Sequence, residues 1–253
     1  MIDLAGKRAF VTGGGRGIGR ATALLLAQAG CAVAVGYRNR RENADETVAA
    51  VGRTGGRAVN VAGDLGDATT ANRIVDEVAR RLGGLDILVV NHGIWPSDDV
   101  PLAGMADGQW EATRRANLDA VVYVCRAVIP HLPDGGRIVL VSSTAGQRGE
   151  AFHADYAATK GAVISLTKSL AVELAPRVTV NCVAPGWVDT EMSAKPYERE
   201  GGRGKREIER TIPLGRVASA EDVAGPIVFL CSELARHITG EVLNVNGGSV
   251  LCG

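Results

Sequence analysis

Tyr156 and Lys160 stand four residues apart, and Ser143 stands thirteen residues before the tyrosine. Positions i and i+4 share one face of a helix, so the phenol and the ammonium are expected to meet. A phenol titrates near ~10 in water, and a fixed positive charge beside it favours the phenolate. A general acid or base works best when its pKa lies near the operating pH. The pair therefore suits proton transfer to or from an oxygen. The alternative is an ordinary solvated helix face, on which such pairs also occur.

A second motif lies near the start of the chain. Residues 12–19 form the run Thr-Gly-Gly-Gly-Arg-Gly-Ile-Gly, between a predicted strand and a predicted helix. Glycines allow the turn to close, and they let backbone amides approach a pyrophosphate at the helix N-terminus. Methyltransferases and flavoproteins use similar loops, and the spacing departs from the plain G-x-G-x-x-G form. The run becomes a strong signal only together with the Tyr/Lys pair.

Short apolar runs alternate with stretches of helical periodicity, which predicts an α/β fold. Continuous apolar strands indicate a sheet that is covered on both faces. We expect a single-domain, doubly wound, Rossmann-like fold over residues 1–253, with a seven-stranded parallel sheet and a ligand crevice at the carboxyl ends of the strands. The predicted strands are 8–12, 32–36, 57–62, 87–91, 137–142, 178–183 and 242–246. The predicted helices are 17–29, 41–53, 68–82, 109–129, 155–175 and 220–231. The segment 191–211, rich in glycine and charge, is predicted to be a mobile substrate loop or lid.

The bulk composition is that of an ordinary soluble globular protein, with 46% hydrophobic residues and a net charge of zero. Nothing in it favours nucleic acid or an anionic membrane as a partner. The N-terminus shows no signal pattern, and no apolar run is long enough to span a bilayer. Five scattered cysteines form no C-x-x-C and do not cluster with the four histidines, so we expect no metal site and a cytoplasmic location.

Taken together, the motifs resemble those of the short-chain dehydrogenase/reductase family, and within it those of the 3-oxoacyl-(acyl-carrier-protein) reductases and their relatives. The similarity spans roughly residues 5 to 248. It rests on the run 12–19, Asp64-Leu65, Asn91-His92-Gly93, Asn117, Ser142-Ser143, Tyr156-x-x-x-Lys160, Pro185-Gly186 and Ile238-Thr239-Gly240.

The resemblance implies hydride transfer between a nicotinamide cofactor and a carbonyl or secondary alcohol. Ser143 would donate a hydrogen bond to the substrate carbonyl, and Tyr156 would exchange a proton with it. Lys160 would bind the nicotinamide ribose and lower the pKa of Tyr156. Asn117 would hold a water that links Lys160 to solvent.

The resemblance also assigns the cofactor contacts. Asp64 would bind the adenine amino group, Asn91 and Gly93 would border the adenosine ribose, and Thr190 with Val188 would hold the carboxamide. The complete expected set is Gly13, Gly15, Arg16, Gly17, Ile18, Gly19, Arg38, Asp64, Leu65, Asn91, Gly93, Tyr156, Lys160, Pro185, Gly186, Val188 and Thr190. The chain departs from the family's usual Asn-Asn-Ala-Gly at Val90 and His92, which puts local packing and cofactor affinity in question.

The end of the second predicted strand favours NADP(H) over NAD(H). Residues 36–40 contain no carboxylate to accept the ribose 2′-hydroxyl of NAD. Arg38 and Arg16 could instead hold a 2′-phosphate with charge-assisted hydrogen bonds worth roughly 1.5–3 kcal/mol each. The alternative is that the run Arg38 to Arg41 only forms the start of a solvated helix.

Aromatic and polar residues near the expected crevice predict a substrate pocket, whose candidates are Trp95, Glu150, Phe152, His153 and Trp187. Rings supply apolar walls for a ligand, although core filling or a solvated loop would explain them as well. An acyl-carrier protein would need a basic patch. Arg177 is retained, but Pro133 and Asp134 stand where basic residues are usual before the fifth strand. This weakens the carrier-protein interpretation.

The leading interpretation is an NADP(H)-dependent ketoreductase or alcohol dehydrogenase that acts on a small molecule and assembles, like most of the family, as a homotetramer. The alternatives are a true 3-oxoacyl-(acyl-carrier-protein) reductase and an NAD-dependent sugar or polyol dehydrogenase. A non-catalytic NADP-binding regulator represents a different class, against which the intact Ser143, Tyr156 and Lys160 argue.

Overall fold

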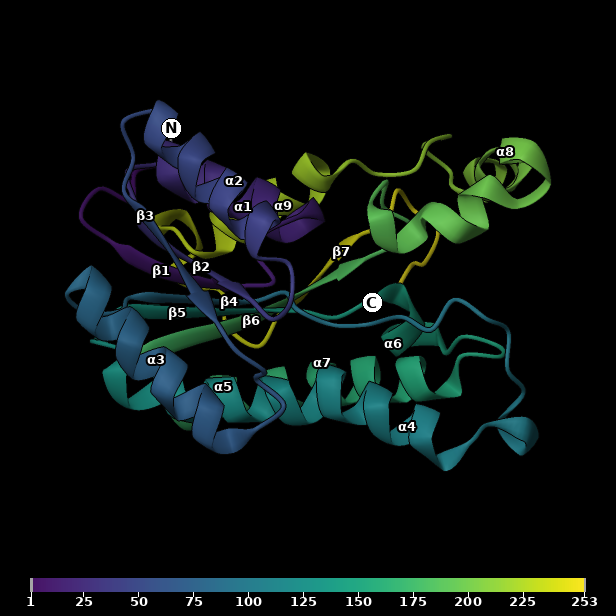
Figure 1. Cartoon of the computed structure of the whole chain (residues 1–253), viewed down its shortest axis with the longest axis horizontal. Coiled ribbons are helices and arrows are strands. Elements are labelled where there is room, and N and C mark those ends of the chain that lie inside the picture. Colours follow the sequence, from purple (N-terminus) through teal and green to yellow (C-terminus); the bar gives the residue numbers. More distant parts are fainter. Residues whose placement is uncertain (1, 253) are drawn as a thin grey trace.

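The computed structural model describes residues 2–252, except the side chains of 199–203. Its centre is a parallel seven-stranded sheet in the order β3-β2-β1-β4-β5-β6-β7, which confirms the predicted fold class (Figure 1). The strands are β1 (Arg8–Thr12), β2 (Ala32–Tyr37), β3 (Ala58–Ala62), β4 (Ile87–Val90), β5 (Gly136–Val141), β6 (Val178–Pro185) and β7 (Val242–Val245). The strand order reverses between β1 and β4, so a crevice is expected at their carboxyl ends.

Helices cover both faces of the sheet (Figure 1). On one face lie α1 (Gly17–Gln28), α2 (Arg41–Arg53) and α9 (Ala220–Leu230), and on the other α3 (Ala68–Leu82), α5 (Ala120–Val128) and α7 (Ala154–Leu174). The remaining helices, α4 (Asp107–Arg114), α6 (Thr144–Arg148) and α8 (Ala194–Thr211), lie toward the carboxyl ends of the strands. None of the helices in the described part of the chain is both long enough and apolar enough for a membrane span.

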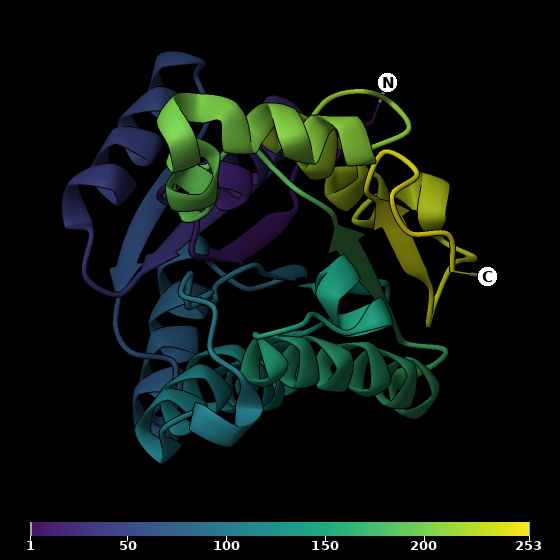
Figure 2. The same ribbon diagram turned by 90° about the vertical axis from the view of Figure 1, so that its right-hand side faces the viewer.

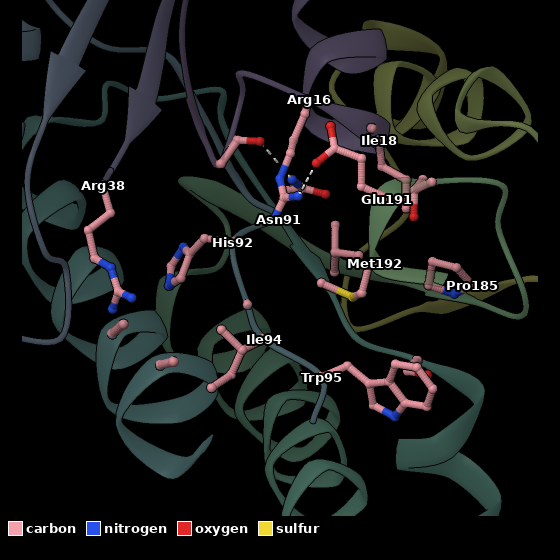
Figure 3. Close-up of a pocket in the computed structure, with 18 of the residues that line it drawn as sticks. Arg16, Ile18, Arg38, Asn91, His92, Ile94, Trp95, Pro185, Glu191 and Met192 are labelled. Carbon is pink, nitrogen blue, oxygen red and sulfur yellow. Dashed lines mark hydrogen bonds and ion pairs between the residues drawn. The ribbon is translucent and has the colours of Figure 1, made fainter. Parts of the chain in front are cut away.

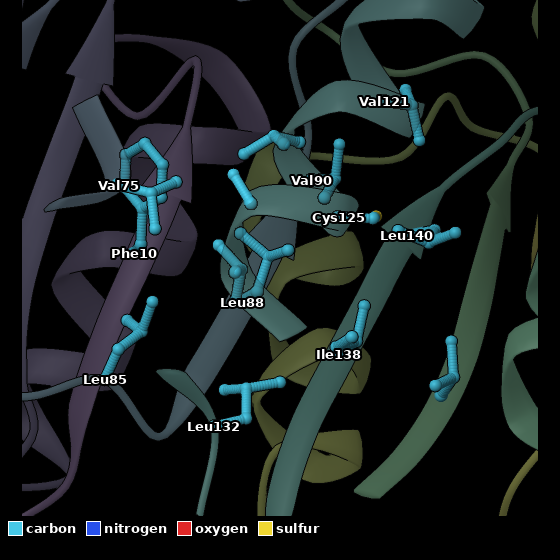
Figure 4. Packing of buried hydrophobic residues seen from close by; sticks show 14 of the residues in the cluster. Phe10, Val75, Leu85, Leu88, Val90, Val121, Cys125, Leu132, Ile138 and Leu140 are labelled. Carbon is cyan, nitrogen blue, oxygen red and sulfur yellow. The ribbon is translucent and has the colours of Figure 1, made fainter. Parts of the chain in front are cut away.

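Alternate residues of the strands supply two apolar cores. Phe10 and Leu88 point toward α3 and α5, whereas their neighbours Val11 and Val89 point toward the helices of the opposite face. Figure 4 shows the first of these cores, with Phe10, Leu88 and Ile138 projecting from adjacent strands. Because each strand is buried on both faces, it needs apolar residues at consecutive positions. This is why the strands could be located from the sequence.

The sequence predicted a loop over residues 191–211, and this prediction is wrong. The segment forms a helical arm. A short 3₁₀ turn, η4 (Glu191–Ser193), leads into α8, which stands apart from α4 and α7 (Figures 1 and 2). Tyr197 and Ile208 are eleven residues apart, about three turns, so they share one face and pack with Ile212 in a small separate cluster. The lysines, arginines and glutamates of this segment are good helix formers, and their effect outweighs the glycines that suggested a loop. Movement of this arm over a substrate stays a prediction.

Candidate active site

A cavity of about 420 Å³ lies where the topology places it, at the carboxyl ends of the strands. Loops after β1 to β4, the ends of β5 and β6 and the start of α7 line it (Figure 3). All the predicted cofactor residues except Gly19 line this cavity, together with Ser143, Trp95, Glu150 and Trp187. Asn117, Phe152 and His153 are not among the described residues that line it.

The glycine run forms a backbone cradle that side chains would fill. Gly13 has a φ of +64°, and a Cβ built at Gly19 would lie 2.1 Å from the carbonyl oxygen of Gly13. The Asn91 amide nitrogen contacts the same carbonyl at 3.3 Å and holds the loop against β4. A side chain at position 19 would collide with the Gly13 carbonyl, so the turn can close only with glycine there. The cradle at the N-terminus of α1 fits the diphosphate of a nicotinamide dinucleotide.

Ser143 and Lys160 are brought together by a short helix that the sequence analysis missed. Ser143 caps α6, accepting a hydrogen bond from the Ala145 N–H at 3.1 Å. A Cβ built at Gly146 would lie 2.6 Å from the backbone of Lys160, so only glycine lets α6 approach α7 this closely. The Ser142 hydroxyl donates to the Lys160 carbonyl at 2.7 Å and completes the junction. A five-residue helix has too little periodicity to be recognised from the sequence.

Lys160 is 5% exposed, and its Nζ donates a hydrogen bond to the Val141 carbonyl at 2.9 Å. Burial lowers the pKa of Lys160 to about 8. The Nζ atom lies 5.8 Å from the centroid of the Tyr156 ring. The predicted meeting of the two side chains on one helix face is therefore present in the structure.

The pKa of Tyr156 shifts in the direction opposite to the one expected from Lys160. Burial raises the pKa, a hydrogen bond with Ser143 lowers it, and the charge of Glu150 raises it further, with a net increase. The Lys160 ammonium faces the ring and donates to Val141, and its own charged form is disfavoured by burial. The phenol of Tyr156 is consequently protonated at neutral pH.

Asn117 lies in a π turn, η2 (Arg115–Asp119), that joins α4 to α5 within the predicted helix 109–129. The Ala120 N–H donates to the carbonyl of Arg115, five residues earlier. Asn117 is fully buried: its Nδ2 donates to the Ile94 carbonyl and its Oδ1 accepts from the Ile94 N–H, both at 2.8 Å. The side chain therefore clamps the loop after β4, and the water-holding role predicted for it stays a prediction. π turns are frequent at functional sites, but the sequence gives no direct signal for one.

Asp155 is a second buried anchor, which the sequence analysis did not identify. Its carboxylate accepts hydrogen bonds from the Thr113 hydroxyl at 2.8 Å, the Gln109 amide at 3.2 Å and the Tyr156 backbone N–H at 2.8 Å. These bonds fix the first turn of α7 against α4. They set the position from which Tyr156 enters the cavity.

The two arginines expected to share a 2′-phosphate do not converge. In Figure 3 the Arg16 side chain is directed toward Glu191 and away from Arg38. The Arg38 guanidinium instead lies 4.0 Å from a carboxylate oxygen of Asp64, which Arg115 also contacts at 2.9 Å. Burial alone would raise the pKa of Asp64, but the Gly66 N–H and these arginines lower it below its ordinary value.

Glu191 connects Arg16 to a third arginine of the rim. Its Oε2 lies 2.5 Å from Arg16 Nη1 and 2.9 Å from Arg40 Nη1. These rim contacts involve charged side chains separated by up to 175 positions in the chain. The sequence pattern could not reveal them.

His92, one of the two departures from the family pattern, is half-buried beside the glycine run and lines the cavity. The Thr12 hydroxyl oxygen accepts from the backbone N–H groups of Asn91 at 3.0 Å and His92 at 3.3 Å, and it lies 2.7 Å from His92 Nδ1. The lone pairs of the Thr12 hydroxyl are thus occupied. The other possible acceptor for the hydroxyl proton, the Val89 carbonyl, is 3.4 Å away. The hydroxyl proton therefore goes to Nδ1, and Nε2 carries the ring hydrogen. Nε2 is buried without a hydrogen-bond partner among the described residues, and burial lowers the pKa of His92 to about 3.

The aromatic rings of Trp95 and Trp187 form another part of the cavity wall. Trp95 and Trp187 meet edge to face at 5.8 Å, and Tyr197 lies 5.9 Å beyond Trp187. His153 is 4% exposed and packs behind Trp95, with 5.0 Å between ring centroids. His153 thus supports the wall. Phe152 is 53% exposed, so its side chain projects toward solvent.

Comparison with known proteins agrees with this architecture. A family model described as enoyl-(acyl carrier protein) reductase matches residues 13–249. The 3-oxoacyl-(acyl-carrier-protein) reductase FabG of Aquifex aeolicus is 41% identical over 98% of both chains. A crystal structure from Brucella melitensis, described as a short-chain dehydrogenase/reductase of the glucose/ribitol dehydrogenase kind, aligns with a TM-score of 0.92 at 35% identity over 99% of both chains. A short-chain dehydrogenase from Burkholderia cenocepacia, in complex with NADP, aligns with a TM-score of 0.90 at 38% identity, covering 97% of this chain and 98% of the other.

The chain belongs to the short-chain dehydrogenase/reductase family. It is an oxidoreductase that acts on CH–OH or keto groups, as the family model and these relatives show.

Proposed function

We propose that this protein is an NADP(H)-dependent ketoreductase that acts on a small carbonyl compound. The observation that carries the proposal is the convergence of Ser143, Tyr156 and Lys160 on one cavity whose rim also holds Arg16, Arg38 and Arg40. Hydride exchange is the chemistry that a nicotinamide cofactor supplies when bound. The glycine cradle and the residues along the loops after β1 to β4 would hold it.

The protein's own residues supply the proton and the orientation. Ser143 and Tyr156 line the same cavity, and Ser143 acts to lower the pKa of the phenol, so both hydroxyls can be directed at one carbonyl oxygen. The raised pKa of Tyr156 keeps the phenol protonated at neutral pH, which supports reduction, the direction that needs a proton donor. Lys160, held by Val141, places a cation beneath the ring.

The preference for NADP(H) is supported by the charge of the rim. The strand β2 ends in Tyr37, and Arg38 and Arg40 follow it without a carboxylate. Arg16 begins α1 and lines the same cavity. Three guanidinium groups favour a 2′-phosphate over a neutral hydroxyl. An oxidising NAD-dependent sugar or polyol dehydrogenase would be expected to carry an acid here instead.

The ring wall favours a substrate with an apolar, flat body over a sugar. Trp95 and Trp187 both line the cavity that Tyr156 also lines, and they offer ring surfaces to a ligand there. A carrier-protein substrate finds less support. The guanidinium of Arg177, the basic residue retained for such a partner, donates a hydrogen bond to the chain's own Leu132 carbonyl at 2.5 Å. A homotetramer and a cytoplasmic location are further elements of the proposal, and light scattering that shows a monomer would remove the first.

Parallel fluorescence titrations with NADPH and NADH test the cofactor, followed by a panel of ketones at saturating cofactor. We expect NADPH to bind at least tenfold more tightly, and flat cyclic ketones to be reduced faster than open-chain 3-oxoacyl thioesters. Equal or tighter binding of NADH would direct the search to alcohol and sugar oxidation. Cofactor binding without turnover of any carbonyl or alcohol would favour the alternative of a non-catalytic NADP-binding regulator.

A further inference from the structure

Glu191 closes an ionic bridge across the mouth of the cofactor cavity. It opens η4, immediately after Thr190, while its two partners begin different helices: Arg16 is the N-cap of α1 and Arg40 the N-cap of α2. One carboxylate oxygen contacts both guanidinium groups, at 2.5 and 2.9 Å. All three residues line the cavity at the carboxyl ends of the strands, and Figure 3 shows the Arg16–Glu191 contact on the side of Met192.

The position held by this carboxylate is chemically a phosphate position. Neither arginine's side chain caps its own helix, so each helix start leaves backbone N–H groups available beside a guanidinium. Helix N-termini and arginines are the groups that bind phosphate oxygens in proteins. Glu191 supplies a single negative charge against two positive ones, whereas a phosphate monoester carries nearly two. A phosphate would therefore match the pair better than the carboxylate does.

We propose that Glu191 is an internal competitor for the arginines that hold the cofactor's 2′-phosphate, and that it sets the protein's affinity for NADP(H) relative to NAD(H). This inference rests on the proposed NADP(H) dependence. It assigns the phosphate to Arg16 and Arg40, which share a partner, rather than to Arg16 and Arg38, which do not converge. Since Glu191 leads into α8, the exchange of partners also separates the helical arm from the cofactor loops.

The size of the effect follows from the exposure of the bridge. The side chains of Arg16, Arg40 and Glu191 are 41%, 59% and 51% exposed, so each ion pair is worth only a fraction of what a buried pair would be. Removing the competitor is therefore expected to tighten phosphate binding roughly three- to tenfold, and less at high salt, where exposed charges are screened.

The test compares the full-length protein with Glu191→Gln and with Glu207→Gln, which makes the same charge change on α8. Fluorescence titration gives the Kd for NADPH and NADH, and calorimetry gives that for adenosine 2′,5′-bisphosphate, which carries the 2′-phosphate without a nicotinamide. We expect Glu191→Gln to tighten NADPH and the bisphosphate three- to tenfold, with NADH changed less than twofold and Glu207→Gln like the wild type.

Two outcomes would overturn the inference. Weaker NADPH binding in Glu191→Gln would mean that the carboxylate positions the arginines instead of competing for them. Equal tightening of NADH would place the competition at the diphosphate common to both cofactors. The parent proposal fails differently: it is wrong if wild type and variant both prefer NADH, whatever their ratio.

Discussion

The floor and the rim of the same cavity are built on opposite principles. By the floor we mean the buried polar groups in and directly behind the cavity lining: Lys160 lines the cavity, and Asn117 and Asp155 lie behind it. All three are nearly inaccessible to solvent, and each has specific hydrogen-bond partners within the protein. On the rim, arginines and carboxylates are about half exposed and pair with one another across the opening. Buried polar groups must be satisfied permanently, whereas exposed ion pairs exchange partners at little cost. The floor is thus fixed before any ligand arrives, and the rim is the part that we propose a charged cofactor rearranges.

The sharpest test of the floor is Tyr156→Phe, which keeps the ring and removes the proton donor. We expect kcat to fall about 10²- to 10⁴-fold, the usual range for a general acid. Because the ring keeps its place over Lys160, cofactor affinity should change little. Stopped-flow reduction of a ketone and a parallel NADPH titration measure the two quantities. Unchanged turnover would remove Tyr156 from the mechanism and with it the proposed ketoreductase chemistry.

Asn117→Ala tests whether the π turn and the loop after β4 form one unit. The change leaves both the N–H and the carbonyl of Ile94 without their partner, at about 1–3 kcal/mol for each unsatisfied buried group. We expect the free energy of unfolding to fall by about 2–4 kcal/mol in urea denaturation. Asn72→Ala, an exposed position on α3, is the matched control and should change it by less than about 0.5 kcal/mol. Equal effects would show that the clamp contributes nothing to stability.

The low pKa of His92 predicts that the folded protein loses stability as the pH falls. Its pKa is about 3 in the folded protein and near ~6.5 in an unfolded chain, so between these values only the unfolded chain takes up the proton. Stability from this residue is therefore complete above pH ~6.5 and is lost as the pH falls. From pH 7 to pH 5 we expect a loss of up to about 2 kcal/mol.

The matched variants are His92→Ala, which should lose less stability over that range, and His237→Ala at an exposed site, which should behave as the wild type. Nitrogen-15 NMR of the wild type at pH 6 should show a neutral ring with hydrogen on Nε2. A titrating His92 signal between pH 5 and 7 would contradict the assignment.

The difference between floor and rim also explains what the sequence could and could not predict. Strands such as β1 and β4 were located because burial on both faces demands continuous apolar residues, and Tyr156 with Lys160 because a helix fixes their spacing. The glycines of α8 indicate a loop, and the helical spacing of Tyr197 and Ile208 is too sparse to outweigh that signal in the sequence.

Other features lie beyond any local pattern. The partnership of Arg16 with Glu191 joins residues 175 positions apart, and it depends on surface charges that many rotamers could pair differently. The pKa of Tyr156 could not be given the correct direction because burial, which outweighs a neighbouring charge here, is not visible in a helical spacing.

The smallest expected effect is the change in the free energy of unfolding when an exposed ion pair of the rim is removed. Arg115→Gln removes an ion pair to Asp64 at 2.9 Å whose side chains are 49% and 36% exposed, so the free energy of unfolding should change by less than about 0.5 kcal/mol. The matched variant, Arg8→Gln, breaks a pair with Asp86 at 2.6 Å, where the carboxylate is only 10% exposed. It leaves that carboxylate without its guanidinium, so we expect a loss of about 1–3 kcal/mol. If urea denaturation shows equal losses for the two variants, burial is not what separates the fixed from the exchangeable ion pairs of this protein.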